Sequence, residues 1–91
     1  MADLIGHLNK MGVIKLHIVS PEGTLVETTV SAVTLPGTLG PFEVLKNHAA
    51  LISSLTKGDI VYVAEGRESR LSIAEGFVEV RDNQVDVCVE V

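Results

Sequence analysis

The sequence predicts an all-β fold, a small antiparallel β-sandwich of about eight to ten short strands. Apolar and polar residues alternate in several segments, and Gly, Pro, Asn and Asp recur between those segments. The 91 residues include two Phe, one Tyr and no Trp, although 46% of them are hydrophobic. A core of this composition has to consist of Val, Ile and Leu, and the β-branched members of that group favour strands.

The first third of the chain carries the clearest strand pattern. In residues 13–19 every second side chain is apolar, which is the period-two pattern of a half-buried strand. Pro21 and Gly23 within 20–23 predict a turn. Residues 24–35 are rich in β-branched side chains, but the alternation slips near Val30. This segment therefore contains two strands or one bent strand.

Residues 42–55 form the only helix candidate, because several of their apolar side chains recur at helical spacing. Asn47 interrupts the segment, no capping box opens it, and Pro41 is its only start signal. We therefore predict two short strands with a bend at Lys46 and Asn47.

Four short apolar segments separated by turn residues make up the remainder of the chain. Asp82 and Asn83 form the clearest turn, since both residue types tolerate left-handed backbone angles. In the last segment the four valines line one face, and Asp86, Cys88 and Glu90 line the other. The expected strands are 60–65, 69–74, 77–81 and 85–91, with turns at 57–59 and 66–67.

Charge and hydropathy restrict the possible partners. The net charge is −5 and the seven Lys and Arg residues are scattered, whereas nucleic-acid binding depends on clustered cations. No apolar run is long enough to cross a bilayer, so we expect no direct membrane insertion. The single Cys88 fits a reducing compartment. Gly6 and Gly12 interrupt any helical stripe in 1–12, so we predict a flexible N-terminal tail there and one β-sandwich domain over 13–91.

No residue pattern typical of a catalytic, metal or cofactor site is present. His7, His17 and His48 have neither H-x-H nor H-E-x-x-H spacing, and Cys88 lies on a different expected strand. No serine lies between the glycines of a nucleophile elbow. The glycines of PGTLG lack the following Lys-Ser/Thr of a phosphate loop. We expect a binding or assembly module with no enzyme activity, metal or cofactor, in which His48 bonds to loop backbone.

The most unusual segment is PGTLGPFEVLKNHAAL, 36–51, which has four Gly and Pro residues in its first six positions. Together with LHIVSPEGTLVE, KGDIVYV and SIAEGFVEVRDNQVDVCVE, it resembles the β-sandwich of the epsilon subunit of bacterial F-type ATP synthases. The resemblance extends from about Val13 to Val91. Its most specific parts are the segment from Leu-Pro-Gly to His-Ala and the segment 76–80.

The resemblance implies a role and two protein partners. In this family the sandwich lies at the foot of the rotating central stalk, on the cytoplasmic face of the bacterial inner membrane. It carries no active site, and it links the gamma subunit to the c-ring, so that ring rotation is coupled to ATP synthesis. Carried over to this sequence, the residues near gamma are Ser20, His48 and Ser53, and the c-ring contact loop is Gly37, Thr38, Leu39, Gly40, Pro41 and Phe42.

The sequence departs from the family pattern in several places. Leu39 and Pro41 stand where family members often carry an acidic residue, which favours an apolar c-ring contact over charge pairing. Glu43 stands in place of a usual glycine, and Ala50 in place of a usual proline. The 91 residues contain no counterpart of the two-helix C-terminal arm of many epsilon subunits. Arm-based inhibition of ATP hydrolysis and nucleotide binding are therefore not expected from this chain.

Two alternatives remain open at this point. A small β-sandwich that binds a peptide or a glycan would need an open edge strand or an exposed aromatic platform, built from Phe42, Tyr62 or Phe77. A small barrel enzyme would need His17 and His48 to come together, and retained zinc would support it.

Overall fold

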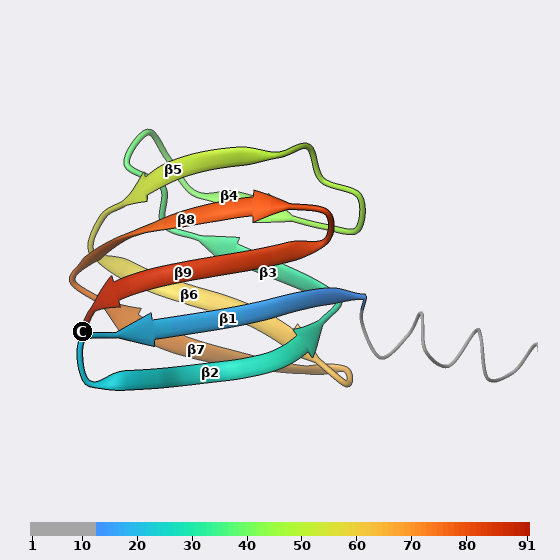
Figure 1. Ribbon diagram of the computed structural model, residues 1–91, viewed down its shortest axis with the longest axis horizontal. Helices are drawn as coiled ribbons and strands as arrows, with labels where there is room; N and C mark the ends of the chain where they lie inside the picture. Colours follow the sequence, from blue (N-terminus) through green and yellow to red (C-terminus); the bar gives the residue numbers. More distant parts are fainter. Residues whose placement is uncertain (1–12) are drawn as a thin grey trace, which may run out of the picture.

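The computed structural model describes residues 13–91, which form two β-sheets packed face to face (Figure 1). One sheet has five strands in the order β2-β1-β9-β8-β5, and the other has four in the order β4-β3-β6-β7. The predicted all-β sandwich is therefore confirmed, and the predicted N-terminal tail lies outside the described residues. The strands are β1 (Ile14–Ser20), β2 (Gly23–Val30), β3 (Ala32–Leu35), β4 (Phe42–Val44), β5 (Leu51–Leu55), β6 (Gly58–Ala64), β7 (Arg67–Ile73), β8 (Glu75–Arg81) and β9 (Gln84–Glu90).

One strand pair departs from the predicted antiparallel arrangement. Strands β1 and β9 pair in parallel, whereas every other pair among the described strands is antiparallel. The β8–β9 hairpin sets the direction of β9, which then lies beside β1 at the centre of the five-stranded sheet. Parallel neighbours need a long connection, and here the intervening strands supply it.

The core lies between the two sheets and is aliphatic, as the composition predicts. Alternate residues of β1 and β9 point inward: Ile14, Leu16 and Ile18 are at most 1% exposed, and the odd-numbered valines of β9 are similarly buried. Val91 is the exception to the predicted valine face, because it follows the end of β9 and is exposed. The buried residues are Ile14, Leu16, Ile18, Val30, Val33, Leu35, Val44, Leu55, Ile60, Ile73, Val78, Val80, Val85, Val87 and Val89.

Two breaks predicted from sequence are among the four points where the described chain changes sheet. Strand β2 ends at Val30, and Ser31 leads into β3 of the other sheet while its N–H donates to the carbonyl of Val63 at 2.9 Å. The predicted bend before β5 is also present, since Asn47 has a positive φ of 63°. The Asn47 N–H donates to the side-chain carbonyl of Asn83 at 2.6 Å, which fixes this bend to the β8–β9 turn. The prediction of two short strands in 42–55 is confirmed, and of the two alternatives for 24–35 the structure has two strands.

The predicted turns hold with small shifts in their boundaries. Asp82 and Asn83 have positive φ angles and form the β8–β9 turn, as predicted. The β6–β7 turn lies one residue before the predicted 66–67, because Glu65 and Gly66 take the two positive φ angles of a tight hairpin. Strand β7 therefore already includes residue 67.

Candidate interaction surface

The loop between β3 and β4, residues 36–41, is fixed by hydrogen bonds to strand β5 of the opposite sheet and to Thr56, which follows that strand. The Thr38 N–H donates to the Ser54 carbonyl at 3.1 Å, and the Thr56 N–H donates to the Pro36 carbonyl at 2.8 Å. The Thr38 and Ser54 hydroxyls lie 2.7 Å apart. The loop is thus part of the sandwich framework, although its tip is exposed.

Gly37 and Gly40 are each required in this loop, for different structural reasons. A Cβ on Gly37 would meet the carbonyl oxygen of Gly40 at 2.6 Å and the Phe42 ring at 3.0 Å, so a side chain does not fit. Gly40 has a φ of +132°, which side-chain-bearing residues rarely adopt. Its N–H closes the turn by donating to the Gly37 carbonyl at 3.0 Å.

The predicted c-ring contact residues fall into two groups in the structure. Thr38, Leu39, Gly40 and Pro41 are exposed, and Leu39 has the full exposure of a free side chain at 103%. Gly37 is buried, and Phe42 is half-buried with its ring against the core. The segment is therefore both a structural corner and a displayed apolar tip.

The outer face of the five-stranded sheet carries an apolar surface beside this loop. In adjacent strands Ser54 pairs with Phe77, Phe77 with Cys88, and Cys88 with Val19. Phe77 is 54% exposed and Ile52 is 76% exposed, while Cys88 is also exposed. We call the side chains of Val19, Ile52, Phe77 and Cys88 the outer patch. It is continuous with the loop through the Thr38–Ser54 hydrogen bond.

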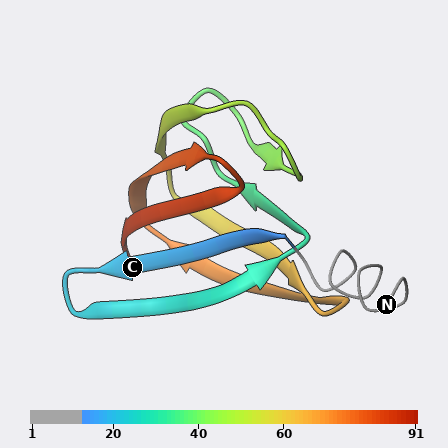
Figure 2. The same cartoon turned by 45° about the vertical axis from the view of Figure 1, so that its right-hand side comes forward.

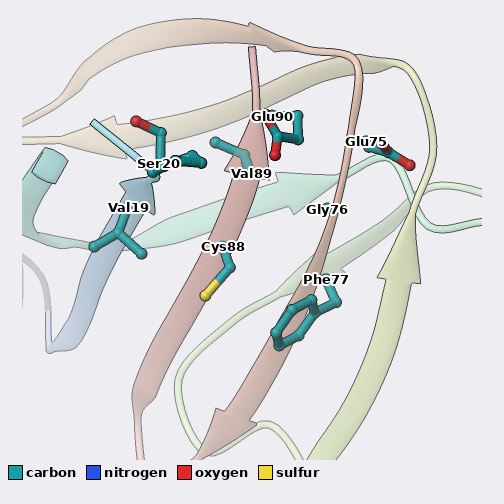
Figure 3. Close-up of a pocket in the computed structure, with 9 residues that line it drawn as sticks. Val19, Ser20, Glu75, Gly76, Phe77, Cys88, Val89 and Glu90 are labelled. Carbon is teal, nitrogen blue, oxygen red and sulfur yellow. The ribbon is translucent and has the colours of Figure 1, made fainter. Parts of the chain in front are cut away.

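A groove with a volume of about 440 Å³ opens at the end of this face (Figure 3). In Figure 3 the side chains of Phe77, Cys88 and Val19 follow one another across β8, β9 and β1. Gly76 on β8 leaves no room for a side chain, since a Cβ there would overlap the Cys88 carbonyl of β9. We call this hollow the end groove; it is lined by Val19, Ser20, Pro21, Glu75, Gly76, Phe77, Cys88, Val89 and Glu90.

The three residues predicted near gamma do not form one cluster. Ser20 lines the end groove, where its hydroxyl accepts a hydrogen bond from the Glu22 N–H at 3.2 Å. Ser53 pairs with the buried Val78 and therefore faces the core side of β5, at the margin of the sheet. Strands β1 and β5 are separated by β9 and β8, about 14 Å at ordinary strand spacing.

His48 lies at the opposite end of the sandwich from the end groove. It belongs to the loop that precedes β5, whereas the 36–41 loop bonds to the far end of that strand (Figures 1 and 2). Its Nδ1 lies 2.7 Å from the carbonyl oxygen of Ala49, and its N–H donates to the Leu45 carbonyl at 3.1 Å. The predicted bonding of His48 to loop backbone is confirmed.

The arrangement of the other chemistry-bearing residues offers no catalytic cluster within 13–91. His17 lies on the outer face of β1, 3.9 Å from Asp86, and is separated from the His48 loop by β9 and β8. Among the described residues no group of three His, Cys, Asp or Glu side chains is placed to hold a metal. Of the three aromatic residues, Phe42 and Tyr62 pack against the core and Phe77 alone is exposed on the surface.

Residues 13–91 match the family described as the ATP synthase delta/epsilon chain, beta-sandwich domain. The chain belongs to this family. The match covers the whole described part of the chain, including the loop and the outer patch. Family membership agrees with the interpretation of the chain as an assembly module.

Over the aligned segments, curated relatives are identical to this chain at about two fifths of the positions. The ATP synthase epsilon chain of Desulfitobacterium hafniense is 40% identical over 79 residues, which are 87% of this chain and 60% of the relative. The epsilon chain of Aliarcobacter butzleri is 42% identical over 80 residues, 88% of this chain and 64% of the relative. The chain therefore spans about three fifths of the length of these relatives.

Solved structures support the fold. A chain in the central stalk and c-ring structure of the Tetrahymena thermophila mitochondrial ATP synthase matches with a TM-score of 0.74 at 14% identity, covering 86% of this chain and 63% of that chain. A chain of the Euglena gracilis mitochondrial ATP synthase matches with a TM-score of 0.78 at 25% identity. The match covers 84% of this chain and 49% of that chain. The described residues contain no helix that is long and apolar enough to span a membrane.

Proposed function

We propose that this chain acts as a non-catalytic subunit of the central stalk of a proton-translocating ATP synthase. In this role it joins the gamma subunit to the c-ring at the cytoplasmic face of the bacterial inner membrane, without entering the bilayer. The observation that carries the proposal is the continuous exposed surface formed by Leu39 and the outer patch, in a chain whose residues 13–91 match the epsilon family.

The outer patch is the proposed contact with gamma. Isolated exposed apolar side chains are common on proteins, but a group in which Phe77 and Ile52 are diagonal neighbours on adjacent strands is typical of an interface. Ser20 lies at one margin of this surface. Ser53 faces the core side of β5, so we propose that its neighbours Ile52 and Ser54 make the contact on that strand, with His48 at the far end.

The 37–42 loop is the proposed contact with the c-ring. Its exposed part presents Leu39 on a backbone that is already held by hydrogen bonds to Ser54, so little conformational entropy is lost on docking. The exposed loop residues carry no charged side chain, which favours contact by shape and apolar surface. Phe42 supports the loop from below through its packing against the core.

A rigid connection between the two contacts suits the transmission of torque. The loop bonds directly to β5, and β5 pairs along its length with β8, which carries Phe77. A force applied at Leu39 therefore acts on a single framework of paired strands, with no flexible linker between the proposed contacts.

Co-purification with the gamma subunit of the same organism tests this proposal. We expect a one-to-one complex on size-exclusion chromatography, which Phe77→Asp or Ile52→Asp weakens by at least 10-fold in affinity because a carboxylate is buried against apolar surface. Glu43→Lys, on the outer face of β4, is the control and should leave the complex intact. A folded chain that forms no complex with gamma would contradict the proposal.

A further inference from the structure

The end groove has an apolar floor and an acidic rim. The exposed or half-buried apolar side chains of Val19, Phe77 and Cys88 supply the floor (Figure 3). At the open end, Glu75 of β8 and Glu90 of β9 are direct cross-strand partners, and both are exposed. No Lys or Arg is among the lining residues, so nothing within the groove neutralises these two carboxylates.

The pairing of Glu75 with Glu90 has an energetic cost in the free chain. Like charges directly opposite each other on adjacent strands repel, and neither residue forms an ion pair with a described residue. A cation brought between the two side chains would remove this repulsion. The groove therefore favours an occupant that is apolar where it meets Phe77 and positively charged where it meets the rim.

We propose that the end groove binds a segment of the gamma subunit in which an apolar side chain adjoins a Lys or Arg. This inference rests on the proposed function and specifies the chemistry of its gamma contact. The apolar side chain inserts between Phe77 and Val19, and the cation lies between Glu75 and Glu90. The volume of about 440 Å³ is within the range of pockets that take such an anchor.

Charge complementarity selects this occupant over a second copy of the chain. The chain has a net charge of −5 and its basic residues are scattered, so two acidic rims would repel each other. A basic segment also associates faster at low ionic strength, because opposite charges steer the encounter. Binding to this groove should therefore weaken as salt rises.

The test compares gamma binding by the 91-residue chain and by the double variant Glu75→Gln, Glu90→Gln at low and at moderate salt. We expect the double variant to bind about 5- to 30-fold more weakly at low salt and to lose most of the salt dependence. The matched control removes two carboxylates elsewhere, Glu43→Gln and Glu65→Gln, and should bind within about twofold of the parent chain. Both control residues are exposed and lie outside the groove.

The outcomes separate this inference from the proposed function. If gamma binds the parent chain and the Glu75, Glu90 double variant equally well at both salt concentrations, the groove assignment is wrong and the stalk role stands. If gamma does not bind the folded parent chain, the proposed function itself fails. Tighter binding of the double variant than of the parent would also overturn the inference, since it would mean that the rim repels its occupant.

Discussion

The hydroxyl groups of Thr38 and Ser54 lie 2.7 Å apart, and this hydrogen bond joins the 36–41 loop of one sheet to strand β5 of the other. It reinforces two backbone bonds at the same place, from the Thr38 N–H and the Thr56 N–H. Ser54 is in turn the cross-strand partner of Phe77. The two proposed contacts, the loop tip and the outer patch, are thus neighbours on one rigid surface.

Thr38→Val removes the hydroxyl but keeps the side-chain shape, so it isolates this hydrogen bond. We expect the free energy of unfolding to fall by about 0.5–1 kcal/mol, and the amide of Thr56 to exchange faster with solvent because the loop opens more often. Chemical denaturation and hydrogen exchange measure both effects. Thr29→Val, at an exposed position of β2, is the control. An unchanged exchange rate at Thr56 would show that the backbone bonds alone hold the loop.

Leu39→Asp tests the c-ring contact without disturbing the fold. Because the side chain is fully exposed, we expect the free energy of unfolding to change by less than about 0.5 kcal/mol. In a reconstituted enzyme, coupling of proton flow to ATP synthesis should fall, since a charge replaces the apolar tip. Glu22→Ala, in the β1–β2 turn, is the control. Full coupling with Leu39→Asp would rule out this residue as a c-ring contact.

Gly37→Ala should destabilise the chain although it adds one methyl group. The added Cβ would meet the Gly40 carbonyl at 2.6 Å, so the turn has to open or the Phe42 ring has to shift. We expect a loss of about 1–3 kcal/mol in unfolding free energy, measured by thermal denaturation. Thr38→Ala changes the exposed residue that follows Gly37, and it should lower the unfolding free energy by less. A Gly37→Ala chain as stable as the parent would mean that the loop adapts freely.

The alternation in 13–19 and 85–91 was enough to predict both strands and their buried faces, because a strand with one buried face has a period of two. The turn at Asp82 and Asn83 was equally predictable from residues that tolerate positive φ. The parallel pairing of β1 with β9 was not, since no local pattern records which distant strand becomes the neighbour of β1.

The candidate site was predicted in part. The Gly and Pro residues of 36–41 marked the loop, but its attachment to Ser54 depends on the packing of the two sheets. The outer patch was missed because Phe77, Cys88 and Val19 come from three strands and meet only through the register of the sheet. One signal was available: Phe77 and Cys88 both occupy polar-face positions in their strands. That pattern places an apolar side chain on the solvent face.

Leu16→Ala tests the aliphatic core. The Leu16 side chain is 1% exposed on β1 and belongs to the buried cluster between the sheets. Truncation removes its contacts and leaves a cavity, which should cost about 2–5 kcal/mol of unfolding free energy. Leu25→Ala is the matched control. Leu25 on β2 is 41% exposed, so its truncation should lower the unfolding free energy far less. Equal losses for the two variants would contradict the assigned core.

Cys88 provides a direct measure of whether the outer patch is covered in the complex. It is the only cysteine of the chain and it is exposed, on the floor of the end groove. A thiol reagent such as N-ethylmaleimide should therefore modify the free chain readily at this one site. In the gamma complex the rate should fall by at least about 10-fold, since alkylation then requires the complex to open.

The reverse experiment uses the same residue as a block. Alkylating the free chain first fills the space between Phe77 and Val19, so the modified chain should bind gamma at least about 10-fold more weakly, with its thermal unfolding little changed. Cys88→Ser has no thiol to alkylate, so treatment with the reagent should leave the gamma affinity of this variant unchanged. Equal alkylation rates for the free and bound chain would show that gamma leaves this face uncovered.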